Sequence, residues 1–188
     1  YEQALAISRD IGDRRSEGNR LGNLGLAYAD LGDTRRAIQY YEQALVISRE
    51  IGDWRGEGTG LGNLGLAYAD LGDTLRAIEY YEQALVISRQ IGDQRSEGTV
   101  LGNVGKMYAD MGEIWRAIEY FERALAVSHE IGDRRGEARN LVNLGAAHAM
   151  ANDLREARRL WTEALALFRD IESPHAATVQ KWLAQMSE

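Results

Sequence analysis

The sequence contains no cysteine and a single proline, Pro174, among its 188 residues. The absence of cysteine excludes disulfide bonds and thiolate metal sites. It also fits a reducing compartment, so we expect a cytoplasmic protein. Because proline breaks the interior of a helix, its scarcity leaves almost the whole chain free to form uninterrupted helix. These two absences favour a helical protein without covalent cross-links.

Positive charge and long apolar runs are also scarce. Lys and Arg total 22 against 29 Asp and Glu, which gives a net charge of −7. A nucleic-acid-binding surface needs clustered positive charge to neutralise phosphates, so we expect no nucleic-acid partner. No apolar run approaches the roughly 20 residues of a membrane-spanning helix, and no signal peptide is visible. A membrane partner is therefore not expected either.

What the sequence does contain is a repeat of 40 residues. The phrase YEQAL at Tyr1 returns at Tyr41 and Tyr81, and it returns as FERAL and WTEAL at Phe121 and Trp161. A fixed period of this length is typical of a stacked repeat array. Such arrays display an extended surface and rarely contain a catalytic pocket. The repeat therefore indicates a binding function.

A second period of 20 residues lies inside the first. Glycine followed by aspartate recurs at Gly12, Gly32, Gly52, Gly72, Gly92 and Gly132, and Gly112-Glu113 and Asn152-Asp153 hold the same slots. Glycine suits the left-handed position that ends a helix, and aspartate caps the next helix. The expected helices span about 1–11, 14–31, 34–51, 54–71, 74–91, 94–111, 114–131, 134–151 and 154–170. A last helix is expected to start from a Ser173 cap with Pro174 in its first turn and to run to about Ser187.

The helices alternate between two types. Type A, at 14–31 in the first copy, contains three glycines, among them Gly25. Each costs a helix about 1 kcal/mol relative to alanine, so we expect a compensating close approach of a neighbouring helix. Type B, at 34–51, is amphipathic and mixes tyrosine with alanine on its apolar face. An A–B pair cannot bury both apolar sides alone, so stability is expected to come from stacked neighbours.

The pattern LGxxY at Leu24–Tyr28, followed by Ala37, Tyr41 and Ala44, resembles the tetratricopeptide repeat. The match returns in the later copies, although His148 replaces the tyrosine in the fourth. The 40-residue period is longer than the common form of about 34 residues. This longer form looks like the repeats of spindle-orientation adaptors related to Partner of Inscuteable. It is also similar to the C-terminal arrays of bacterial STAND ATPases and caspase-like CHAT proteins.

The resemblance implies an all-α superhelix of antiparallel helix pairs with about ten helices. Its expected divisions are a partial repeat at 1–13, repeats at 14–53, 54–93, 94–133 and 134–173, and a C-terminal capping helix at 174–188. The first two full copies agree at 33 of 40 positions and the last two at only 11, a drift typical of a terminal repeat. Nothing comparable protects the helix at 1–11, so we expect a C-terminal piece of a longer protein.

In this family the type A helices line a concave groove, which corresponds here to their polar stripe. The groove positions are Asn19, Asn23, Leu26 and Asp30; Thr59, Asn63, Leu66 and Asp70; Thr99, Asn103, Lys106 and Asp110; and Arg139, Asn143, Ala146 and Met150. A carboxamide both donates and accepts hydrogen bonds, so the recurring asparagines predict binding of an extended peptide backbone. Alternatively, the asparagines brace a neighbouring helix or were inherited by duplication.

Two rows of carboxylates accompany this stripe. Asp30, Asp70 and Asp110 favour a basic ligand, unless they are only solvated helix ends. The second row lies in the first turn of each type A helix, where we expect ion pairs with arginine between repeats; it consists of Glu17, Glu57, Glu97 and Glu137.

No nucleophile–base set, phosphate-binding loop or metal cluster stands out in the sequence. His129, His148 and His175 lie on different expected helices without metal-ligand spacing. We therefore expect no cofactor, no metal and no enzymatic activity.

The leading hypothesis is a non-catalytic protein–protein interaction module that binds an extended peptide. One alternative is a regulatory sensor array of a larger ATPase or protease, whose catalytic domain would precede Tyr1. Another is a self-assembling scaffold, in which an uncapped N-terminal helix exposes Tyr1, Ala4, Leu5 and Ile7 to a second molecule.

Overall fold

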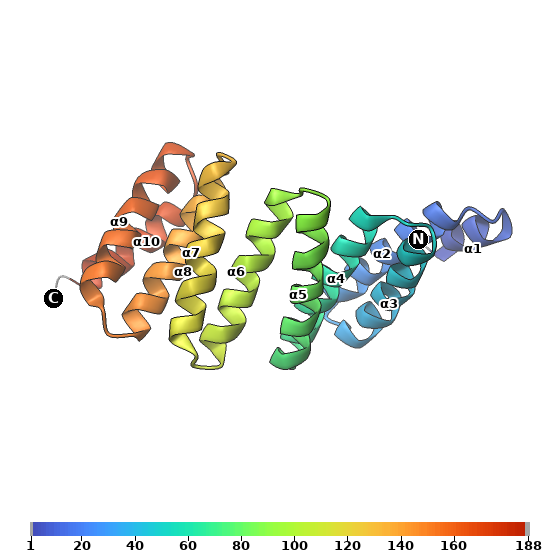
Figure 1. Ribbon diagram of the computed structural model, residues 1–188, viewed down its shortest axis with the longest axis horizontal. Coiled ribbons are helices and arrows are strands. Elements are labelled where there is room, and N and C mark those ends of the chain that lie inside the picture. The colour runs from blue at the N-terminus through green and yellow to red at the C-terminus, as the bar shows by residue number, and fades with distance from the viewer. Residues whose placement is uncertain (1, 187–188) are drawn as a thin grey trace. The chain divides into compact units, whose positions relative to one another are not determined.

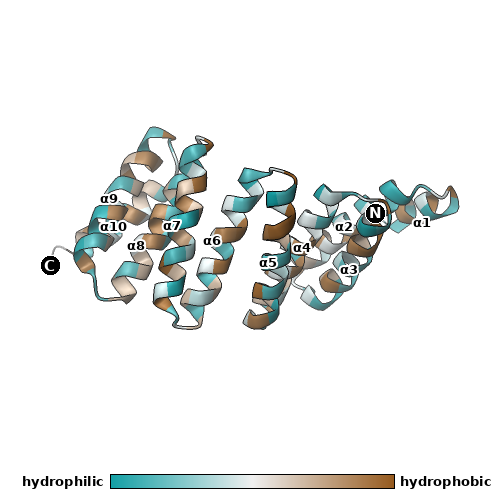
Figure 2. Ribbon diagram, viewed as in Figure 1, coloured by the Kyte–Doolittle hydropathy of each residue, from teal (hydrophilic) through white to brown (hydrophobic). Residues whose placement is uncertain are grey.

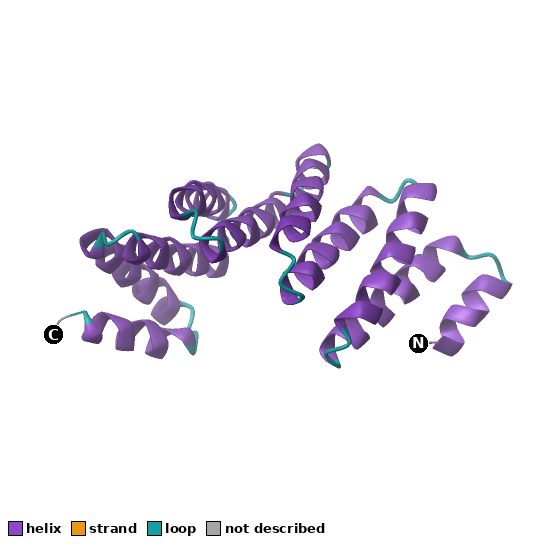
Figure 3. Ribbon diagram, turned by 90° about the horizontal axis from the view of Figure 1, so that it is seen from below, coloured by secondary structure: helices purple, strands orange, loops and turns teal. Residues whose placement is uncertain are grey.

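The computed structural model describes residues 2–186, where every element is a helix or a loop and no strand occurs (Figure 3). The chain divides into two compact units, Tyr1–Gly92 and Asp93–Glu188. Ten helices lie within the described residues. The all-α fold of helix pairs expected from the sequence is thus confirmed. Among residues 2–186, no helix has both the length and the apolar character needed to cross a membrane.

The first unit contains two helix pairs preceded by one short helix. Each type A helix lies beside the type B helix that follows it, α2 with α3 and α4 with α5 (Figure 1). The helices are α1 (Glu2–Asp10), α2 (Arg14–Asp30), α3 (Thr34–Glu50), α4 (Trp54–Asp70) and α5 (Thr74–Gln90). Helix α4 also contacts α3 and α2, so the two pairs stack on each other.

The second unit has two helix pairs followed by one short helix. Helix α8 contacts α7 and α6, and α10 packs against α9. The helices are α6 (Gln94–Asp110), α7 (Ile114–Glu130), α8 (Arg134–Met150), α9 (Leu154–Asp170) and α10 (His175–Gln185). All helices except α10 agree with the expected ranges to within one residue at either end. The division into repeats at 14–53, 54–93, 94–133 and 134–173 stays a prediction.

The Gly-Asp pairs explain this agreement. Gly52 ends α3 with a left-handed φ of +67°, and the Oδ1 of Asp53 accepts a hydrogen bond of 3.0 Å from the backbone N–H of Gly56. Asn152 takes over the glycine's place with a φ of +63°. Glu113 is the exception, because its side chain makes no cap hydrogen bond.

We expect Asp73→Ala to lower the free energy of unfolding by about 0.5–2 kcal/mol, because the Asp73 side chain caps α5 through the N–H of Arg76. Glu113→Ala is the matched control, since both residues form an ion pair with the arginine three positions later. That change should cost less than about 0.5 kcal/mol. Denaturant unfolding measures both, and equal losses would show that the cap bond contributes nothing.

Helix α10 differs from its expected start and end. It begins at His175 with Pro174 as its N-cap, and it ends at Gln185. The Ser173 side chain accepts only a long hydrogen bond of 3.4 Å, from the N–H of His175. Serine stands where aspartate caps most other helices, and the backbone N–H of Ala176 donates to the Ser173 carbonyl at 3.2 Å in a tighter turn, so the regular helix starts one residue later. The expected end at Ser187 lies outside the described residues.

Close approach of helices compensates for some of the glycines but not for all. A Cβ built on Gly65 would lie 2.6 Å from the Tyr81 ring, and one on Gly25 would lie 2.4 Å from the Tyr41 ring. Both rings are buried. By contrast, a Cβ on Gly22 or Gly62 would meet nothing within 4 Å. The packing prediction is therefore confirmed for Gly25 and wrong for Gly22.

Each helix buries one face, and hydrophobic and hydrophilic residues alternate along the helices (Figure 2). Helix α1 was expected to leave its apolar residues exposed, but Leu5 is only 7% exposed and packs with Leu21 and Leu24. That expectation is wrong for Leu5 because α2 covers it. Ile7 is 60% exposed, as expected, and Tyr1 lies outside the described residues.

Candidate functional site

A cleft opens between α2, α3 and α4 of the first unit, with a volume of about 440 Å³. Five of the predicted groove residues line it, three on α2 and two on α4: Asn19, Asn23, Leu26, Thr59 and Asn63. The residues therefore come together although they belong to different repeats, because the polar stripes of two stacked type A helices form adjoining walls.

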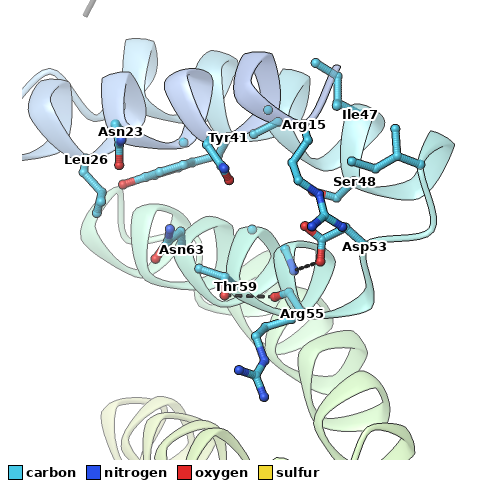
Figure 4. A pocket seen from close by; sticks show the side chains of 17 residues that line it. Arg15, Asn23, Leu26, Tyr41, Ile47, Ser48, Asp53, Arg55, Thr59 and Asn63 are labelled. Carbon is cyan, nitrogen blue, oxygen red and sulfur yellow. Dashed lines mark hydrogen bonds between the residues drawn. The ribbon is translucent and has the colours of Figure 1, made fainter. Parts of the chain in front are cut away.

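The two asparagines stand on facing walls of this cleft. Figure 4 shows Asn23 on α2 and Asn63 on α4, with the side chain of Tyr41 reaching in from α3. Both asparagines are half-buried. Within residues 2–186, neither carboxamide makes a hydrogen bond to another residue, whereas Thr59 donates to the Arg55 carbonyl at 3.0 Å. Bracing of a neighbouring helix through a hydrogen bond is therefore not seen for either asparagine, and both carboxamides have unused donors and acceptors.

The hydroxyl of Tyr41 adds an uncharged hydrogen-bond donor between Asn23 and Asn63. Burial raises the pKa of its hydroxyl, and the negative charges of Asp30 and Asp70 raise that pKa further. The hydroxyl therefore keeps its proton at neutral pH. Asp30 stands one helical turn after Leu26, which lines the cleft, and Asp70 holds the same place on α4; both side chains are exposed to solvent.

Two arginines line the cleft as well, although they are not among the predicted groove positions. Arg15 and Arg55 are exposed, and neither side chain forms an ion pair or a hydrogen bond within the described part of the chain. They lie near the N-terminal ends of α2 and α4, whereas Asp30 and Asp70 end these helices. The cleft thus has a cationic edge and an anionic edge.

Gly60 contributes no side chain to the wall of the cleft. It lines the cleft, and its counterpart 80 residues later is Asn140. Asn140 is fully buried and donates through Nδ2 to the Ser128 hydroxyl at 3.0 Å. Ser48, the counterpart of Ser128, also lines the cleft of the first unit. An asparagine side chain therefore occupies in one repeat the space that glycine leaves empty in another.

The other predicted groove residues lie on the same stripe but outside this cleft. Leu66 on α4 is exposed, as are Thr99, Lys106 and Asp110 on α6 and Arg139 and Met150 on α8. Asn103, Asn143 and Ala146 are half-buried, as Asn23 and Asn63 are. Arg139 lines a separate cavity beside α10.

Three of the four glutamates of the first turn, Glu17, Glu57 and Glu137, pair with the preceding type B helix. Glu17 is buried, and its carboxylate lies 2.8 Å from Arg9 of α1 and 2.6 Å from Arg14. Glu57 pairs with Arg49 at 2.7 Å, but the partner of Glu137 is His129 at 2.9 Å. The prediction of arginine pairs is therefore confirmed for Glu17 and Glu57 and wrong for Glu137, where histidine replaces the arginine.

A pH dependence follows from Glu17. The hydrogen bond from Arg9, aided by Arg14, lowers the pKa of this carboxyl although burial opposes the shift. A lowered folded pKa stabilises the fold above the usual glutamate pKa of about 4.3, and the effect is lost as pH falls through the folded value. Glu17→Gln should therefore lower the free energy of unfolding at pH 7, and the difference from the unmodified chain should shrink below about pH 4.

Denaturant unfolding between pH 3 and pH 7 measures this difference. Glu42→Gln is the control, because Glu42 is exposed and has no ion partner within residues 2–186. A Glu17→Gln loss that does not change with pH would contradict the ion-pair account.

Among residues 2–186, no group of three or more histidines, aspartates and glutamates is placed to hold a metal ion.

A comparison of the sequence with known protein families identifies the family of this chain. The pattern described as tetratricopeptide repeat matches residues 1–50, 56–130 and 99–170. The chain belongs to the tetratricopeptide repeat family. Repeats of this family generally mediate the binding of protein partners and are generally non-catalytic. A search of curated proteins found no match.

Solved structures show the same tetratricopeptide repeat fold. Aspartyl phosphate phosphatase F from Bacillus subtilis superposes with a TM-score of 0.90 at 17% identity, over 97% of this chain and 48% of the phosphatase. BtubC (BKLC) from P. vanneervenii gives 0.78 at 25% identity, over 86% of this chain and 67% of BtubC. A Signal Transduction ATPase with Numerous Domains (STAND) protein with a tetratricopeptide repeat sensor, from Pyrococcus horikoshii, gives 0.80 at 21% identity, over 90% of this chain and 27% of that protein. The chain thus spans about half of the phosphatase and about a quarter of the ATPase.

Proposed function

We propose that this tetratricopeptide repeat chain is a protein–protein interaction module that binds an extended peptide across the type A helices. The observation that supports this proposal most is the pair of carboxamides at Asn23 and Asn63. They line one cleft from two repeats and make no hydrogen bond to another residue in the described chain. Each offers a donor and an acceptor to a peptide group, without demands on the partner's side chains.

The two edges of the cleft define the partner further. Side chains of an extended peptide alternate between opposite sides of its backbone. With the backbone on Asn23 and Asn63, one set of side chains faces the edge of Asp30 and Asp70. The other set faces Arg15 and Arg55. The preferred partner therefore carries basic residues on one side of an extended segment and small or acidic residues on the other.

Peptide display on the purified chain, followed by calorimetry with a selected peptide, tests the proposal. The double variant Asn23→Ala/Asn63→Ala should bind about tenfold more weakly or worse, because each lost hydrogen bond contributes about 0.5–1.5 kcal/mol. Gln43→Ala/Gln83→Ala is the matched control. It removes two exposed carboxamides at the same 40-residue spacing from type B helices, away from the cleft. Selection of no peptide, or equal losses in both double variants, would overturn the proposal.

Two expectations from the sequence extend this function. A regulatory array in a larger ATPase is supported only by the fold it shares with the STAND sensor. The full reading frame around Tyr1 tests it, and a start codon with no further domain would defeat it. In the self-assembly hypothesis, the exposed Ile7 of α1 contacts a second copy of the chain. Light scattering over a concentration series tests this hypothesis, and a chain that stays monomeric would exclude it.

A further inference from the structure

A second cavity lies in the second unit, enclosed by α8, the end of α9 and α10. Its volume is about 540 Å³. Small-molecule sites in proteins typically occupy about 300–1,000 Å³ and combine apolar walls with a few polar groups. This cavity has that composition, and it is separate from the cleft of Asn23 and Asn63.

Five of its ten lining residues are apolar, two of them aromatic, and the polar ones other than the arginines are Ser173, His175 and Thr178. Phe168 and Val179 are buried, and Val142 and Trp182 are half-buried. The Trp182 ring lies 5.4 Å from that of Trp161, whose Nε1–H donates to the Val142 carbonyl at 3.0 Å. These contacts hold the walls in place without a ligand. Preformed apolar walls of this kind favour a ligand with an aromatic or aliphatic body.

Two arginines form the cationic edge of the cavity. Arg135 and Arg139 stand four residues apart on α8, so their side chains lie on the same face of the helix. Both are exposed, and neither forms an ion pair or a hydrogen bond within residues 2–186. The described residues that line the cavity include no aspartate or glutamate. Guanidinium groups bind carboxylates through paired hydrogen bonds, so this edge suits an anionic group.

The residues that line this cavity differ in polarity and charge from those at the equivalent repeat positions of the first cleft. Phe168 occupies the repeat position of Ser48, and Val179 occupies that of Thr59. Arg139 stands where Asn19 stands. Two polar positions are therefore replaced by apolar ones, and a neutral amide is replaced by a positive charge. The ligand of this cavity must differ from the peptide backbone proposed for the first cleft.

We propose that the cavity between α8, α9 and α10 binds a small organic carboxylate. Its carboxylate pairs with Arg135 and Arg139, and its apolar body lies against Phe168, Val179 and Trp182. The charge of the two arginines and the apolar side chains beside them together favour such an amphipathic anion over a neutral hydrophobe or a polar ion.

Benzoate, 4-phenylbutyrate and octanoate are suitable probes, with 4-phenylbutan-1-ol as the neutral analogue. Binding is followed by the change in tryptophan fluorescence, and Trp182→Phe identifies the signal from the cavity. We expect saturable binding of at least one carboxylate, and binding about tenfold weaker for the alcohol and for Arg135→Gln/Arg139→Gln. Both arginines are exposed, so this variant should keep its fold, which circular dichroism checks.

The matched control is Arg15→Gln/Arg55→Gln, which removes two exposed arginines at the repeat position of Arg135. It should bind the carboxylate as the unmodified chain does, and so should Asn23→Ala/Asn63→Ala. Failure of all three carboxylates to saturate the signal would overturn the proposal. So would equal affinity for the alcohol, or unchanged affinity in Arg135→Gln/Arg139→Gln.

Discussion

Gly65→Val is expected to lower the free energy of unfolding by about 1–3 kcal/mol. A Cβ at this position would lie 2.6 Å from the Cδ1 and Cε1 atoms of Tyr81. The ring is only 1% exposed, so it cannot move aside without disturbing α5 or the core around it. Overpacking of a filled core is destabilising by this amount, and the cost outweighs the slightly better helix propensity of valine.

Gly62→Val is the matched control for this change. It lies in the same helix and changes helix propensity equally, but a Cβ there meets nothing within 4 Å. Urea unfolding of the two variants isolates the packing cost of the Gly65–Tyr81 contact. If both variants unfold at the same urea concentration, helix contact is not the reason for glycine at position 65.

Gly60→Asn is expected to close the peptide cleft while the chain stays folded. A Cβ at Gly60 would make ordinary contacts of 3.7 Å or more with Leu45, so an asparagine fits there. Its amide would then reach the Ser48 hydroxyl, as Asn140 reaches Ser128 at 3.0 Å. With the space occupied, we expect a selected peptide to bind about tenfold more weakly or worse.

The control for this change is Gly62→Asn, because Gly62 does not line the cleft. Calorimetry with the peptide and urea unfolding are run on both variants. Gly60→Asn should lose peptide affinity without losing stability, and Gly62→Asn should lose neither. A Gly60→Asn chain that is stable and binds the peptide at full affinity would place the binding surface elsewhere.

Helix positions could be predicted from the sequence because their signals are local. Gly52 and Asp53 end one helix and cap the next within two residues, so no knowledge of neighbouring helices is needed. The close approach at Gly25 could also be predicted, since a glycine inside a helix implies a reason for its cost. The same rule failed for Gly22, because nothing in the sequence tells which face of the helix a neighbour will cover.

The parts of the site that could not be predicted depend on contacts between helices. Glu17 pairs with Arg9 of the preceding helix and with Arg14 of its own helix, and not with Arg15. That pairing leaves Arg15 available at the edge of the cleft. The open space at Gly60 and the cavity of Arg135 likewise result from how three helices meet, and a single helix contains no signal for either.

The asparagines include positions whose place could be predicted from the sequence and one whose role could not. Repetition at 40 residues identified Asn23 and Asn63 as a set, and the structure places both in one cleft. Asn140 lies outside that set and serves a buried structural role through Ser128. Residue type alone does not separate these roles; the position on the helix does.

The central claim is that the carboxamides of Asn23 and Asn63 bind the partner's backbone. An NMR titration that follows their side-chain NH₂ signals, assigned through Asn23→Asp and Asn63→Asp, tests it most directly. We predict that both signals shift as a selected peptide is added and saturate at the concentration that calorimetry gives. A peptide that binds with the same affinity while both signals stay unchanged would contradict the claim.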